Sequence, residues 1–99
     1  MNREDRSPSL PGEALVDQGL ADLAENRVTD CSLLLLIVAP RLRRLGILVP
    51  DRPSPQPCEH ALYARLNQRL GPAAHSYYNS LIRRVVSYAR ALERERSRA

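Results

Sequence analysis

The last quarter of this chain, residues 76–98, combines an apolar stripe and a cationic stripe at helical spacing. Its apolar residues recur every three or four positions: Tyr78, Leu81, Ile82, Val85, Ala89 and Leu92. Arg83, Arg90 and Arg94 fall on the opposite side of the same predicted helix. A helix of this kind buries its apolar face against other elements and presents its charged face to solvent or to a partner. The pattern therefore constrains the architecture of the chain more closely than its activity.

Three further segments also predict helices, so we expect an all-α protein. The predicted helices run over residues 11–25, from Thr29 to just before Gly46, over residues 57–70 and over residues 73–95. A chain of 99 residues, 43% of them hydrophobic, is large enough for one buried core. We predict a small four-helix domain of two helical hairpins over residues 11–96, after a flexible polar tail at residues 1–10. The proline-rich stretch 50–57 is interpreted as the connector between the hairpins rather than as a PxxP ligand.

The second predicted helix is apolar on every side. Residues 33–38 read Leu-Leu-Leu-Leu-Ile-Val without a polar break. A buried β-strand is the competing interpretation of so short a run, but Leu dominates and Thr29 precedes the run as a helix N-cap. We therefore predict a helix that is buried on all sides. Pro40 must kink or split this helix, because it lacks an N–H group and clashes with the preceding turn.

Shorter signals predict how the helices end and which faces they bury. Asn26 can take the left-handed conformation that ends the first helix, and Gly46 followed by Ile47 is typical of a C-terminal cap with a hydrophobic contact. Gly19 is expected to weaken the middle of the first helix by about 1 kcal/mol relative to Ala. In the third helix, the residues expected to face the core are Leu62, Tyr63, Leu66 and Leu70.

The charges divide the chain into an acidic first part and a basic remainder. Residues 1–30 carry a net charge of −4, and residues 31–99 carry +8. A basic body favours an anionic partner, such as nucleic acid or an acidic protein, although the acidic first helix could cover and neutralise part of this surface. All 15 basic residues are Arg, which we attribute to the codon usage of a GC-rich bacterial genome rather than to a need for bidentate contacts.

Side chains suited to catalysis or metal binding are few and poorly spaced. Cys31, Cys58, His60 and His75 are of the types that bind zinc, but Cys-x-His is not a usual ligand pair and the other two are isolated. Cys58 and His60 lie two positions apart on a helix, so they do not face each other. Neither His has an acidic residue placed to orient it. We therefore expect no enzymatic activity, no catalytic residue, no metal or other cofactor, and no small-molecule substrate.

The most polar aromatic stretch begins the last helix. His75, Tyr78 and Asn79 share one helix face through spacings of three and four residues. As a recognition patch they would offer a ring for stacking, together with an imidazole and an amide for hydrogen bonds. In the alternative interpretation, which we favour, Tyr78 belongs to the core, His75 caps the helix and Asn79 is solvated.

Nucleic acid and membrane are two further classes of partner. The tight Gly71-Pro72 turn between the last two helices is compatible with a helix-turn-helix, with His75, Ser76 and Asn79 as candidate base readers. Against this interpretation, the last helix is long for a recognition helix. The longest apolar run has seven residues, whereas ~20 are needed to span a bilayer. We also do not expect a membrane-surface partner, because the last helix lacks Trp, Phe and Lys and needs its apolar face for the core.

The favoured function is that of a small non-enzymatic interaction or regulatory protein that binds an acidic partner. Its arginine-rich surface would comprise Arg41, Arg43, Arg44, Arg83, Arg84, Arg90 and Arg94, each offering a planar fork to carboxylate or phosphate. A helix-turn-helix-like nucleic-acid-binding protein is the alternative. We also expect a homodimer, in which the apolar second helix or the last helix meets its two-fold mate. The polar N-terminus without a signal peptide and the small number of cysteines favour the cytoplasm.

Overall fold

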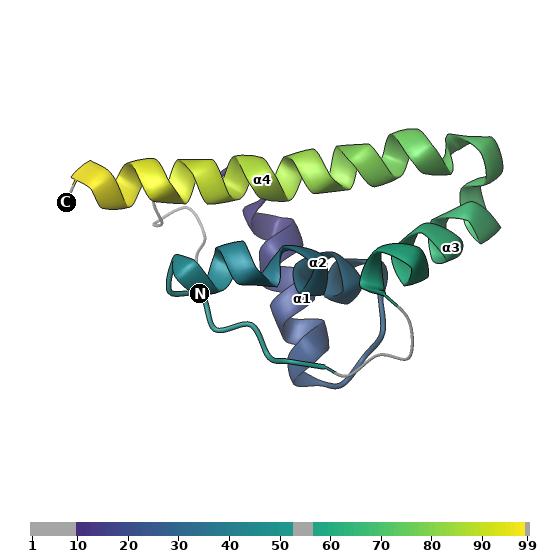
Figure 1. Cartoon of the computed structure of the whole chain (residues 1–99), viewed down its shortest axis with the longest axis horizontal. Coiled ribbons are helices and arrows are strands. Elements are labelled where there is room, and N and C mark those ends of the chain that lie inside the picture. Colours follow the sequence, from purple (N-terminus) through teal and green to yellow (C-terminus); the bar gives the residue numbers. More distant parts are fainter. Residues whose placement is uncertain (1–9, 53–56, 99) are drawn as a thin grey trace, which may run out of the picture.

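The computed structural model describes residues 10–52 and 57–98, which form helices joined by short connections (Figure 1). The helices are α1 (Glu13–Ala24), α2 (Asp30–Arg44), α3 (Cys58–Leu70), the short 3₁₀ helix η2 (Gly71–Ala73) and α4 (Ala74–Arg98). The described residues contain no strand, so the predicted all-α class is confirmed. Residues 1–9 of the predicted tail and residues 53–56 of the proline-rich connector lie outside the described residues.

The long helix α4 runs along one edge of the molecule, and the other helices lie on one side of it (Figure 1). α3 folds back beneath the N-terminal end of α4, while α1 and α2 lie beneath the rest of it. α2 and α4 each pack against every other α-helix. Fully buried core side chains come from all of these helices: Val16, Leu23, Leu34, Leu35, Leu42, Leu62, Leu66 and Val85. This arrangement leaves the outer face of α4 open.

Local capping signals form the junction between α1 and α2. Asn26 adopts a left-handed φ of 61°, and the N–H of the next residue donates to the carbonyl of Asp22, which closes α1 as a Schellman motif. Thr29 then caps α2. Its hydroxyl oxygen accepts from the Ser32 N–H at 3.1 Å, and the Ser32 hydroxyl accepts from the Thr29 N–H at 2.8 Å. The predictions for Asn26 and Thr29 are both confirmed.

The apolar run in the middle of the chain is helical, which excludes the strand alternative. α2 continues past Pro40 to Arg44 and is not split. The prediction of burial on all sides is wrong in part, because Pro40 is exposed and half of the apolar run is only partly covered. Three residues of the run are buried and the next three are only partly covered: Leu33, Leu34 and Leu35, then Leu36, Ile37 and Val38.

Two residues of α3 do not face the core as predicted. Tyr63 and Leu70 keep 40% and 37% of their surface exposed. α3 packs through Leu62 and Leu66, which are both fully buried. Tyr63 lies beside this contact, where its ring meets that of Tyr78 edge to face, with 5.9 Å between centroids. The inward stripe of α3 is narrower than its periodicity predicts, because α2 and α4 are the α-helices that pack against it in the described part of the chain.

Candidate interaction surface

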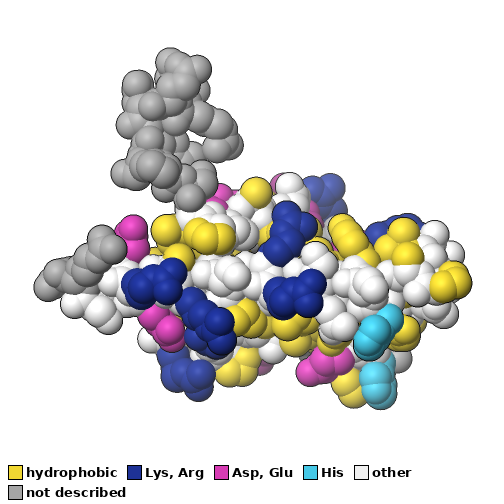
Figure 2. Space-filling view, turned by 90° about the horizontal axis from the view of Figure 1, so that it is seen from above, with side chains coloured by type: hydrophobic (Ala, Val, Ile, Leu, Met, Phe, Trp, Pro, Cys, Tyr) yellow, Lys and Arg dark blue, Asp and Glu magenta, His cyan; other side chains and the backbone are white. Residues whose placement is uncertain are grey.

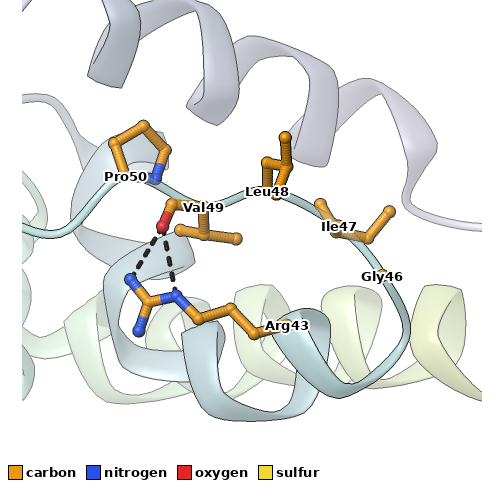
Figure 3. A pocket seen from close by; sticks show the side chains of 6 residues that line it. All are labelled: Arg43, Gly46, Ile47, Leu48, Val49 and Pro50. Carbon is orange, nitrogen blue, oxygen red and sulfur yellow. Dashed lines mark hydrogen bonds between the residues drawn. The ribbon is translucent and has the colours of Figure 1, made fainter.

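The seven arginines predicted to bind a partner divide into two groups, of which the first is engaged within the chain. Arg41 of α2 pairs with Glu93 of α4, with 3.4 Å between NH2 and Oε1. Arg43 donates from Nε and NH2 to the carbonyl oxygen of Val49, at 3.1 and 2.7 Å (Figure 3). Both guanidinium groups therefore already have an acceptor in the folded chain.

The contact made by Arg43 borders a hollow at the end of α2 (Figure 3). Gly46 has a φ of 90°, and the N–H of Ile47 donates to the carbonyl of Leu42, so the chain turns back in the predicted C-terminal cap. The hollow has a volume of about 390 Å³ and is lined by Arg43, Gly46, Ile47, Leu48, Val49 and Pro50. Arg43 is the single charged side chain among these six, and it is already bonded to Val49. The lining thus offers no acid, base or nucleophile to a substrate.

The second group of arginines remains exposed, and most of it lies on α4. Its members are Arg44 on α2 and Arg83, Arg84, Arg90 and Arg94 on α4. Among the described residues, the side chains of these five arginines form no hydrogen bond and no ion pair. Figure 2 looks onto α4 from outside the molecule and shows arginine side chains spread along this face. Within the part of the chain that the structure describes, no ion pair joins these five arginines to an acidic residue of α1.

Two arginines of α3 hold the fold together. Arg65 and Arg69 both bind the carboxylate of Asp30, with N–O distances of 3.0 and 2.6 Å, and so tie α3 to the first turn of α2. Burial acts to raise the pKa of Asp30, but the hydrogen bonds from Arg69 and Arg65 outweigh it and hold the pKa below its ordinary value of 3.8. The sequence pattern placed Asp30 at a helix start but contained no signal for partners 35 and 39 positions away.

A second structural carboxylate, Asp22, lies at the end of α1 and is only 3% exposed. It accepts hydrogen bonds from the Thr29 hydroxyl at 2.6 Å and from the Gln18 amide at 2.9 Å, and Arg27 lies 3.4 Å away. The Thr29 hydroxyl, helped by Gln18 and Arg27, lowers the pKa of Asp22 below 3.8 despite the opposing effect of burial. One carboxylate thus joins the last turn of α1 to the N-cap of α2.

Because both carboxyl groups have a lower pKa in the folded chain, we expect the protein to lose stability in acid. Their contribution is complete above the ordinary pKa of 3.8 and is lost as the pH falls through the folded values, since the unfolded state takes up protons first. The urea concentration at the midpoint of unfolding should therefore decrease as the pH is lowered below about 4. Asp22→Asn should flatten this pH dependence. The control Asp51→Asn, at an exposed position, should leave it unchanged. A midpoint independent of pH in the wild type would contradict the assignment.

The predicted recognition patch separates into a core residue and two surface residues. Tyr78 is half-buried against Tyr63, and burial raises the pKa of its hydroxyl. His75 and Asn79 are exposed, with 3.3 Å between Nε2 and Nδ2. Tyr77, which belongs to the same polar aromatic stretch but not to the predicted face, is 41% exposed. The start of α4 therefore presents an imidazole, an amide and a phenol to solvent, with Tyr77 supplying the ring expected from Tyr78.

The thiols and histidines do not form a reactive or metal-binding cluster. Cys31 and Cys58 are free and partly buried, and burial raises the pKa of both thiols. A raised pKa keeps a thiol protonated at neutral pH, which makes it a poor nucleophile. Within residues 10–52 and 57–98, no three His, Cys, Asp or Glu side chains are grouped so that they could hold a metal ion.

No helix in the described part of the chain has both the length and the apolar character needed to cross a bilayer. Comparison with protein-family models, with curated proteins and with solved structures finds no match to this chain.

Proposed function

We propose that this chain is a small non-enzymatic interaction or regulatory protein that binds an acidic partner through the arginines of α4. The observation that carries the proposal is the row formed by Arg83, Arg90 and Arg94 on the exposed face of α4. Arg83 and Arg90 are two helical turns apart and Arg94 is one turn further, so all three lie on one side of the helix. Arg90 and Arg94 repel each other at this spacing, and a partner with matching negative charge relieves that repulsion.

Four other arginines have secondary parts in this proposal. Arg84 and Arg44 extend the cationic surface, because both are exposed and have no acceptor among the described residues. Arg41 contributes indirectly, because it holds the carboxylate of Glu93 and so offsets a negative charge on α4. Arg43 keeps the chain after α2 in place through Val49. We propose that the last two arginines shape the surface rather than contact the partner.

The proposal also includes a homodimer of four-helix protomers, each made of two helical hairpins, in the cytoplasm. α2 supports it better than α4 as the two-fold element. Leu36 and Ile37 are only partly covered, and Pro40 on the same side is exposed, whereas two α4 outer faces would bring like charges together. Light scattering should then report about twice the protomer mass of 11.1 kDa. A single 11.1 kDa species at all concentrations would remove the dimer from the proposal.

Affinity capture from an extract of the native host tests the proposal, with and without nuclease treatment. Three baits are compared: the wild type, the triple variant Arg83→Gln/Arg90→Gln/Arg94→Gln, and the control Arg27→Gln. Arg27 is exposed and cationic, but it lies in the connection between α1 and α2. Figure 1 shows this connection on the opposite side of the molecule from α4. We expect an acidic partner to bind the wild type and the control, and its recovery to fall more than about tenfold with the triple variant. Equal recovery with all three baits would refute the proposal.

A helix-turn-helix-like nucleic-acid-binding protein is the second candidate, and one observation favours it. α3 and α4 are joined only by η2, and the first turns of α4 expose His75, Ser76 and Asn79. Hydroxyl and amide side chains are among those that reach base edges in nucleic-acid complexes. Nuclease treatment separates the two candidates, because it abolishes the capture of nucleic acid and leaves the capture of an acidic protein intact.

A further inference from the structure

The outer face of α4 carries a continuous stripe of only two residue types. Its positions follow one another at alternating spacings of four and three residues: Ser76, Ser80, Arg83, Ser87, Arg90, Arg94 and Ser97. We call these seven residues the Ser/Arg stripe. A repeat of this spacing keeps all members on one side of a helix. At 1.5 Å per residue, the stripe is about 31 Å long.

The Ser/Arg stripe is open to solvent and free of acidic residues. Ser80 is partly covered and the other six members are exposed. Figure 2 views this face directly and shows arginine side chains on it, with white and yellow surface between them. The two acidic residues of α4, Glu93 and Glu95, lie off the stripe near its C-terminal end, and Glu93 is paired with Arg41. The stripe therefore offers an uninterrupted set of hydrogen-bond donors with a net positive charge.

The composition of the Ser/Arg stripe bears on the kind of acidic partner it fits. Protein–protein interfaces have an apolar core and are depleted in Ser, whereas the stripe has no apolar member and four serines. Contacts to a nucleic-acid backbone come from Arg and from Ser hydroxyls as well as from other polar groups. The stripe therefore matches a phosphodiester polymer more closely than a protein surface.

This inference rests on the α4 arginine surface of the proposed function and takes the partner class of the second candidate. We infer that the partner is duplex DNA and that the Ser/Arg stripe lies in its major groove. That groove is about 12 Å wide and admits an α-helix. α4 is placed for this, because α1, α2 and α3 all lie on its inner side (Figure 1). Its arginines can donate bidentately to phosphate or to guanine, and its serine hydroxyls can donate to phosphate or to base edges. The major groove of A-form RNA is too narrow for a helix, so duplex RNA is a poorer fit.

Fluorescence anisotropy with a labelled DNA duplex of about 20 base pairs tests the inference across about 50–200 mM salt. Each phosphate contact adds about 0.9 to the slope of log affinity against log salt. The triple variant Arg83→Gln/Arg90→Gln/Arg94→Gln should therefore have a slope about 2.7 smaller. Over this salt range the wild type should lose about 40-fold more affinity than the triple variant. Arg90→Gln should lower the slope by about 0.9, and Arg27→Gln, which removes one charge away from α4, should leave it unchanged.

Two further probes, duplex RNA of the same sequence and poly-L-glutamate of equal charge, complete the experiment. The inference requires DNA to bind more tightly than duplex RNA and poly-L-glutamate. It also requires that the salt slope for DNA decrease in the α4 variants and not in Arg27→Gln. Equal binding of duplex RNA would overturn the placement of α4 in the major groove. Binding of poly-L-glutamate without DNA would overturn the inference while leaving an acidic protein partner in place. Failure of all three probes, or equal affinity of wild type and triple variant for DNA, would overturn the inference. Recovery of a protein partner in the capture experiment would then still support the proposed function.

Discussion

Leu34→Ala is expected to lower the free energy of unfolding by about 2–5 kcal/mol. Leu34 is 0% exposed and lies on α2, which packs against α1, α3 and α4. Truncation to Ala removes buried apolar surface and leaves a cavity, and the neighbouring helices can close it only in part. A loss of this size is a large share of the total stability of a small domain, so the effect should be visible at room temperature.

Urea unfolding followed by far-UV circular dichroism measures this change. Leu48→Ala is the matched control, because Leu48 is 90% exposed and its truncation should change the free energy of unfolding by less than about 0.5 kcal/mol. If Leu34→Ala does not fold, Leu34→Val removes less volume and should give a smaller loss of the same sign. A variant at Leu34 as stable as the Leu48 control would contradict the central position of α2.

Features decided within one turn of backbone could be predicted from the sequence. Thr29 caps α2 through Ser32, and Asn26 and Gly46 end α1 and α2 with positive φ angles. In each case the signal and its partner lie within a few positions, so no knowledge of the tertiary packing is needed. The alternation of buried Val85 with exposed Arg83 and Arg90 on α4 was likewise readable, because one packed face decides it.

Features that depend on how helices are oriented could not be predicted. Tyr63 and Leu70 follow the apolar periodicity of α3, yet both are substantially exposed. Periodicity gives the apolar side of a helix but not the width of the surface that its neighbours cover. The same limit applies to α2. Its apolar run extends around the whole helix, but the second half of the run is only partly covered.

For the candidate site, the sequence identified the exposed arginines of α4 but could not separate them from Arg41 and Arg43. Arg41 meets Glu93, 52 positions away, only because α2 and α4 pack together. Arg43 meets the carbonyl of Val49 because the chain turns back after α2. The partner of a charged side chain is decided by tertiary packing, which the sequence pattern does not contain. A count of arginines therefore overstates the number that are available to a ligand.

Asp22 is a case in which the sequence held a usable signal. Gln18 precedes it by four positions, which places the two side chains together on α1. An acidic residue at the end of one helix and a Thr N-cap at the start of the next can lie close together when the connection is short. This pattern could have predicted the hydrogen bond between Asp22 and Thr29, seven positions further on. Burial of the carboxylate could not be predicted, because it depends on how α1 packs against α2.

Gly19 carries the clearest difference between a propensity argument and a packing argument. From the sequence, this glycine only weakens α1, by about 1 kcal/mol relative to Ala. In the structure it is buried where α1 meets α2, and a Cβ there would lie 2.5 Å from Leu35 Cγ and 2.7 Å from the carbonyl oxygen of Cys31. The second of these atoms belongs to the α2 backbone and cannot move aside without displacing the helix. The absence of a side chain therefore permits the close approach of the two helices.

We accordingly expect Gly19→Ala to destabilise the protein by about 1–3 kcal/mol, the usual cost of overpacking a core, in spite of its better helix propensity. Ala14→Gly is the control on the same helix. Ala14 is exposed, so this change should cost about 1 kcal/mol through propensity alone. Replacing Gly by Ala at position 19 and replacing Ala by Gly at position 14 should thus both lower the urea midpoint, although they change propensity in opposite directions. A higher midpoint for Gly19→Ala would show that α1 and α2 lie further apart than described.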